Sequence, residues 1–84
     1  MRVRIRGKRW VIRDDTRIKY AGWCHYDKHL IRVRKNQEVR ERLDTLIHEL
    51  LHARQPGWGE RDVWSMAKVV SKVLWQDGWR RIEK

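Results

Sequence analysis

Hydrophobic and charged residues alternate at the start of the chain with the two-residue period of a β-strand. In RVRIRGKRWVIR, Val3 and Ile5 alternate with arginines, Gly7-Lys8 is suited to a turn, and residues 10–13 run back. This pattern predicts a β-hairpin.

The alternation is interrupted by DDT and is harder to follow in the next segment, RIKYAGWCHYDKH. We expect a short strand ending at Gly22 and an irregular loop through Asp27. Residues 30–34, LIRVR, alternate again and predict a clearer strand.

Apolar spacing then becomes helical. Asn36 is a suitable N-cap and Glu38 a favourable first-turn acid for a helix that runs to about Ala53. Pro56 and Gly57 end it. Its apolar stripe consists of Val39, Leu43, Leu46, Ile47 and Leu50.

A second helix is expected from about Glu60 to Gln76, between Gly59 and Gly78. Its apolar stripe consists of Val63, Met66, Ala67, Val70, Val73 and Leu74.

Strands followed by a helical hairpin predict an α+β fold. We expect a small antiparallel or mixed N-terminal sheet of three to four strands, then two helices, in a single domain spanning residues 1–84. A domain of this size has a small core, so a bound metal would also add to its stability.

Positive charge is concentrated in the first part of the chain. Residues 1–35 hold 12 Lys/Arg against 3 Asp/Glu, a balance of +9, whereas residues 36–84 hold 9 against 8, a balance of +1. This asymmetry is typical of a nucleic-acid-binding segment, and the alternative is a solvated, charged sheet surface.

Membrane insertion and secretion are not expected. No apolar run approaches the roughly 18–20 residues that a membrane span needs, and the basic start MRVRIRGKRW is not followed by an apolar segment. The single cysteine, Cys24, excludes an internal disulfide framework, and a buried free thiol is favoured over a metal ligand or nucleophile. A cytoplasmic protein is the default expectation.

The first helix contains His48-Glu49-Leu50-Leu51-His52. Two histidines one turn apart lie on one helical face and can bind one metal ion together. Zinc lowers the pKa of a bound water towards about 7. Glu49, at an adjacent position, can accept a proton from that water when it attacks.

The phase of the helix separates the histidines from its apolar stripe. At about 100° per residue from Val39, the stripe centres on roughly 0–80°, and His48 and His52 lie at about 180° and 220°. They are therefore not ordinary core histidines, and the alternative to a metal site is a solvated face with two unrelated histidines.

A catalytic zinc site needs a third protein ligand and an open position. Gln55 and Trp58 stand where the longer metzincin pattern has glycine and histidine. The start of the second helix should lie beside His52, which makes Glu60 our preferred third ligand and Asp62 the alternative. Either acid could instead have no role in metal binding and only stabilise the N-terminus of the second helix through its favourable interaction with the helix dipole.

With these residues identified, the chain resembles a known family. LDTLIHELLHA, a Pro-containing turn with an acid, and a helix ending in VLWQDGWR resemble minimal zincin-type metallopeptidases, many of them encoded by phages and prophages. The likeness covers about residues 28–81 and extends more distantly to SprT/Spartan-like zinc peptidases, which usually carry a further histidine after the motif.

The resemblance implies a gluzincin-like core. His48, His52 and Glu60 would bind zinc and Glu49 would be the general base. The strand at residues 30–34 would be the sheet edge along which an extended peptide substrate pairs.

Other candidate residues carry weaker signals. His25 and His29 are expected to be surface histidines, and His25, Tyr20 or Tyr26 is a candidate to stabilise an oxyanion. The tryptophans are expected to pack in the core and its rim, including the two in the basic segment, where base stacking is the alternative: Trp10, Trp23, Trp58, Trp64, Trp75 and Trp79.

Two functions follow. The first is a zinc-dependent peptidase, acting on a protein that is associated with nucleic acid. The second is a non-catalytic nucleic-acid-binding module with a structural or vestigial zinc site. Reading of the major groove by residues 60–77 is disfavoured, because they hold three basic and three acidic residues. The sequence does not indicate an oligomeric state.

Overall fold

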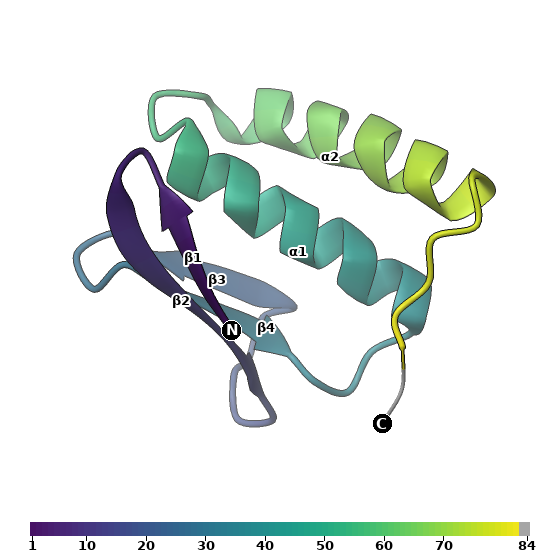
Figure 1. Ribbon diagram of the computed structural model, residues 1–84, viewed down its shortest axis with the longest axis horizontal. Helices are drawn as coiled ribbons and strands as arrows, with labels where there is room; N and C mark the ends of the chain where they lie inside the picture. The colour runs from purple at the N-terminus through teal and green to yellow at the C-terminus, as the bar shows by residue number, and fades with distance from the viewer. Residues whose placement is uncertain (83–84) are drawn as a thin grey trace.

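A four-stranded sheet followed by two helices makes up the protein, as the computed structural model, which describes residues 1–82, shows (Figure 1). The predicted α+β fold is confirmed. The elements are β1 (Arg2–Ile5), β2 (Lys8–Asp15), β3 (Gly22–His25), β4 (Leu30–Arg34), α1 (Val39–Arg54) and α2 (Glu60–Gln76).

The sheet is mixed, with strand order β1-β2-β4-β3. β2 and β4 are parallel, and the two outer pairings are antiparallel. The expectation that residues 30–34 form the sheet edge is wrong, because β4 pairs on both sides and its Ile31 and Val33 are 0% exposed. The edge beside β4 is β3.

The boundaries of the first three strands also differ from the sequence prediction. The hairpin turn is Arg6-Gly7, where both φ angles are positive (51° and 76°), as a type I′ turn requires. β2 continues through Asp14 and Asp15 because arginines pair with both carboxylates. β3 begins at Gly22, where we expected a strand to end.

The first helix begins later than predicted. Glu38, and not Asn36, is its N-cap residue, and α1 ends at Arg54 with Gln55 as its C-cap. The predicted bounds of the second helix, Glu60 and Gln76, agree with α2.

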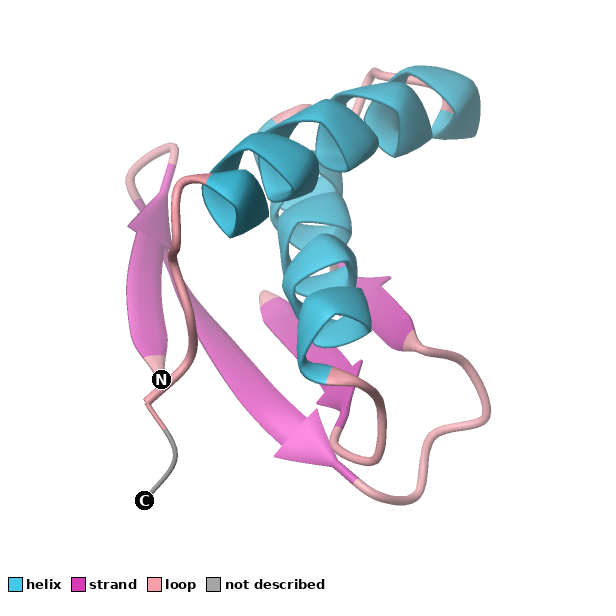
Figure 2. Ribbon diagram, turned by 90° about the vertical axis from the view of Figure 1, so that its right-hand side faces the viewer, coloured by secondary structure: helices cyan, strands magenta, loops and turns pink. Residues whose placement is uncertain are grey.

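Figures 1 and 2 show three layers: the sheet, then α1, then α2 on the far side of α1. One face of the sheet packs against Leu46 and Leu50 of α1. This core consists of Ile5, Trp10, Ile12, Cys24, Ile31, Val33 and Ala53.

α2 is buried on a narrower face than its sequence indicated. Val63 and Ala67 are 0% exposed against α1, whereas Met66 and Val73 of the predicted stripe are exposed, because α1 covers one side of α2 only. Among the described residues, no helix has the length and apolar character needed to cross a membrane.

Of the six tryptophans, Trp10 is buried and Trp75 is partly buried, so packing in the core or its rim is confirmed for these two. The other four are exposed: Trp23, Trp58, Trp64 and Trp79.

Asp14 joins three parts of the chain. Its carboxylate accepts hydrogen bonds from Arg42 of α1 (Oδ1 to Nη2, 2.7 Å) and Arg81 of the C-terminal segment (Oδ2 to Nη2, 3.0 Å). Burial opposes ionisation of Asp14, but the hydrogen bonds and charges of these arginines outweigh it and hold its pKa below the ordinary value.

We expect Asp14→Asn to lower the free energy of unfolding by about 1 kcal/mol at pH 7. Since the folded-state pKa is depressed, this contribution is present above the unfolded pKa of about 3.9 and is lost as pH falls through the lower folded value. Urea unfolding at pH 7 and pH 3 measures both effects. Asp27→Asn is the control, and an equal loss in the two variants at pH 7 would contradict the assignment.

Candidate metal centre

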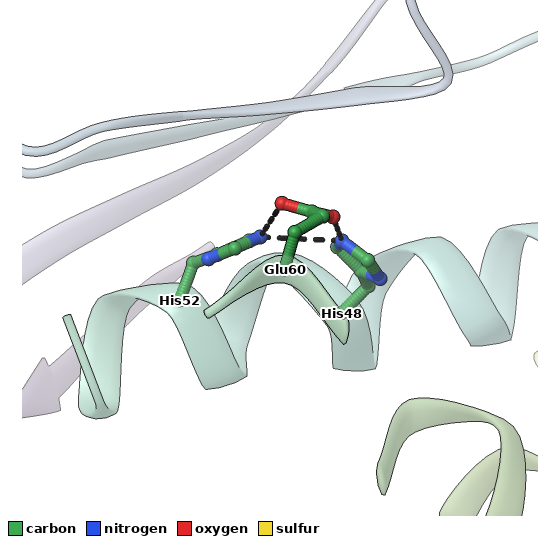
Figure 3. A group of neighbouring side chains, drawn as sticks. All are labelled: His48, His52 and Glu60. Atoms are coloured by element: carbon green, nitrogen blue, oxygen red, sulfur yellow. Dashed lines mark hydrogen bonds and ion pairs between the residues drawn. The ribbon is translucent and has the colours of Figure 1, made fainter. Parts of the chain in front are cut away.

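Three side chains that the sequence analysis singled out converge at one end of α1 (Figure 3). The Nε2 atoms of His48 and His52 lie 3.2 Å apart. Glu60 spans them, with Oε1 2.6 Å from His48 Nε2 and Oε2 2.9 Å from His52 Nε2. His48, His52 and Glu60 thus form a group that could hold a metal ion.

Local chain geometry explains the convergence. His48 and His52 are one turn apart on α1. The chain between the helices is short, and a hydrogen bond from Trp58 N–H to the Gln55 carbonyl (3.0 Å) closes it. Glu60, the first residue of α2, is thereby placed beside the last turns of α1.

Of the two acids considered for a third ligand, the structure brings Glu60 to the histidines. Asp62 does not belong to any group of three potential ligands within the described residues, nor do His25 and His29. Helical phase alone did not separate Glu60 from Asp62, because both lie in the first turn of α2.

The spacing of the two histidine nitrogens matches a tetrahedral centre. Two ligand atoms on a tetrahedral ion with metal–nitrogen bonds of about 2.05 Å lie roughly 3.3 Å apart. The two histidine nitrogens are 3.2 Å apart, whereas the Glu60 oxygens lie 2.6 and 2.9 Å from them, at hydrogen-bond distance. Since the side chains of His48 and His52 are 17% and 14% exposed and that of Glu60 is 70% exposed, the group is neither a solvated face nor a closed interior site.

Glu49 lies on the side of α1 that packs on the sheet, and it is 8% exposed. Burial raises its pKa to about 7, an effect that the charge of His48 reduces and that of Glu60 increases. Among the described residues no side chain or backbone N–H donates a hydrogen bond to this carboxylate. Glu49 lines the cleft, and a carboxylate with a raised pKa in a cleft is characteristic of functional sites.

The backbone of β3 approaches α1 most closely at Gly22. A Cβ atom at this position would lie 2.7 Å from Thr45 Cγ2 and 2.9 Å from both Cγ and Oε2 of Glu49. Glycine is therefore required where the edge strand meets the helix. The sequence analysis did not identify this role, and the only signal was a glycine at a strand boundary.

A cleft of about 640 Å³ opens over these residues. Residues 20–24 and Tyr26 form one wall, and α1 and Glu60 form the other. Of the three oxyanion candidates, Tyr20 and Tyr26 border the cleft and His25 does not. The oxyanion role itself stays a prediction.

Cys24 is buried, as expected of a free thiol. Burial, and then the charge of Glu49, raises the pKa of the Cys24 thiol to about 12. Because the thiolate is the reactive form, this environment disfavours a nucleophilic cysteine.

Comparison with protein-family models, with curated proteins and with solved structures finds no match for this chain.

We expect Gly22→Ala to lower the free energy of unfolding by about 1–3 kcal/mol, because the added methyl group overpacks the contact with Thr45 and Glu49. Urea unfolding measures the loss. Gly57→Ala is the matched control, since a Cβ there meets nothing within 4 Å. If both variants unfold like the parent protein, β3 does not approach α1 as described.

Proposed function

We propose that the protein is a zinc-dependent metallopeptidase of the minimal zincin type, with His48, His52 and Glu60 as metal ligands and Glu49 as general base. The observation that carries this proposal is the placement of Glu49, a mostly buried residue with a raised pKa, one residue from His48 and in the same cleft as the three ligand residues. As the chain carries one cysteine, we place the protein in the cytoplasm.

The donor set supports zinc as the metal. Two imidazoles and one carboxylate are the ligands of a well-known class of catalytic zinc sites, and three protein ligands leave a fourth position open. When bound, zinc would polarise a peptide carbonyl and lower the pKa of water in the site.

The chain's own contribution to proton transfer would come from Glu49. A carboxylate whose pKa lies near 7 can both take a proton from water and return it to a leaving amine at neutral pH. The low exposure of Glu49 keeps bulk water from competing for its oxygens.

An extended peptide would bind along β3. In the antiparallel pair with β4, Arg34 N–H donates to the Ala21 carbonyl (2.7 Å), and hydrogen-bonded positions alternate along such a pair. The backbone groups of Gly22 and Cys24 therefore point away from β4, towards the free edge of the sheet. Both residues line the cleft, so a peptide paired there by main-chain hydrogen bonds would pass the metal ligands.

A structural zinc site in a binding module is the alternative function. Structural zinc sites have four protein ligands and are closed to solvent. Here three ligands border a cleft, and Glu60 is largely exposed. This openness favours catalysis over a structural role.

We expect the purified protein to contain about one zinc ion per chain and the His48→Ala/His52→Ala variant to contain none. Glu60→Gln should weaken zinc binding at least tenfold, whereas Asp62→Asn, two residues away, should leave it unchanged. Elemental mass spectrometry gives the metal content, and competition with a chelating dye gives the affinity. Zinc binding that is insensitive to Glu60→Gln and lost in Asp62→Asn would reassign the third ligand.

We expect Glu49→Gln to retain zinc but to cleave a fluorogenic peptide library at least about 100-fold more slowly, because the amide cannot accept the proton. Glu41→Gln, an exposed acid at the start of the same helix, is the control. Full cleavage by the zinc-loaded Glu49→Gln variant would remove the general base from the proposal.

A further inference from the structure

The sheet has one face packed against α1 and an opposite face over which no helix lies (Figures 1 and 2). The packed face contributes Ile5, Trp10, Ile12, Cys24, Ile31 and Val33 to the core. Because successive side chains of a strand point to opposite faces, the residues between these lie on the open face.

Strand register arranges the side chains of the open face in four rows. Across β1 and β2, Arg4 lies opposite Arg9. The second row runs over all four strands, the third over β2, β4 and β3, and the fourth over β2 and β4. These rows are Arg2-Val11-Leu30-His25, Arg13-Arg32-Trp23 and Asp15-Arg34.

This open face is strongly basic. It carries six arginines, Arg2, Arg4, Arg9, Arg13, Arg32 and Arg34, and a single acid, Asp15. Asp15 is paired with Arg32, so the other arginines have no ion pair with an acid on the face within the described residues. Half of the 12 basic residues in positions 1–35 are thus displayed on one surface.

One of the register pairs opposes like charges with no acid between them. Arg4 faces Arg9 across the antiparallel pair of β1 and β2, whereas Arg32, the neighbour of Arg13, is paired with Asp15. Like charges directly opposite each other destabilise a sheet. A bound polyanion would relieve this repulsion, which is a specific reason to expect an anionic partner here.

An exposed aromatic group completes the third row. Trp23 is 47% exposed, stacks on His25 (ring centroids 4.7 Å apart) and meets Tyr20 edge-on (5.8 Å). In the register Trp23 is the neighbour of Arg32. An aromatic ring held upright beside arginines on an open sheet can stack on a nucleobase while the arginines contact phosphates.

We propose that the open face of the sheet binds single-stranded nucleic acid, with Arg4, Arg9 and Arg13 contacting phosphates and Trp23 stacking on a base. A single strand fits better than a duplex, whose bases are not free to stack on a side chain. The arginines lie on the face of the sheet opposite the helix that carries the metal ligands, whereas Trp23 also borders the cleft, so variants of the metal centre test whether the two functions are separate.

The test is fluorescence anisotropy with labelled oligothymidylate, oligouridylate and a mixed-sequence duplex of equal length, over a range of salt concentrations. Arg9→Gln/Arg13→Gln is compared with Arg61→Gln/Lys72→Gln, which removes the same charge from α2. Trp23→Ala is compared with Trp64→Ala, an exposed tryptophan of α2. Arg9→Gln relieves the like-charge pair with Arg4, and Arg13 is exposed, so the double variant should fold at least as stably as the parent protein.

We expect Arg9→Gln/Arg13→Gln to weaken single-strand binding about tenfold and to reduce the steepness of the log–log salt dependence by about 1.4, or about 0.7 for each lost phosphate contact. Trp23→Ala should weaken binding roughly fivefold or more, with the α2 variants near the parent value. Binding of either the DNA or the RNA strand supports the proposal.

Equal losses in Arg9→Gln/Arg13→Gln and Arg61→Gln/Lys72→Gln would show that net charge alone drives binding and would overturn the proposal. The proposal would also be overturned if the duplex bound as tightly as the single strand and Trp23→Ala had no effect on binding. Retained binding by Glu49→Gln and by His48→Ala/His52→Ala separates this surface from the metal centre.

Discussion

The candidate site depends on the close approach of the β3 backbone to α1 at Gly22. With no side chain at this position, the strand lies against Thr45 and Glu49, and the distances leave no space for a methyl group. This contact buries most of Glu49 between helix and sheet, although the residue still borders the cleft. It also brings the free edge of the sheet alongside the residues that could hold a metal. One backbone contact therefore sets both the chemical environment of Glu49 and the wall of the cleft.

α1 is the central layer, and its sides have different partners. One side packs on the sheet through Leu46 and Leu50. Another side meets α2, where Asp44 accepts hydrogen bonds from Lys68 (2.9 Å) and Ser71 (3.2 Å). The histidines lie on a side that neither layer covers completely, so they are partly buried yet open to the cleft. The short connection between the helices then brings the first residue of α2 into reach.

Charge is divided between two regions of this small molecule. Acidic groups face the cleft, among them the buried Glu49, whose raised pKa reflects the cost of keeping a carboxylate there. Arginines occupy the open face of the sheet, where the like-charge pair of Arg4 and Arg9 also opposes stability. Both arrangements are unfavourable for the isolated chain, and a cation in the cleft and a polyanion on the sheet would each offset one of them.

The sequence by itself determined the α+β class, the bounds of α2 and the pairing of His48 with His52 on one helical face, because helical periodicity and glycine or proline boundaries are local properties. It also indicated Glu60, through the short turn before it. Strand order was decided only by the tertiary structure: the alternation in LIRVR predicted a strand and the family resemblance implied an edge, but pairing on both sides depends on partners far along the chain. The burial of Glu49 and the role of Gly22 were likewise not predictable from the sequence pattern. Both arise where β3 contacts α1, a helix that begins fourteen residues after β3 ends. In addition, β3 has only one buried side chain, which gives too short a pattern to identify the strand.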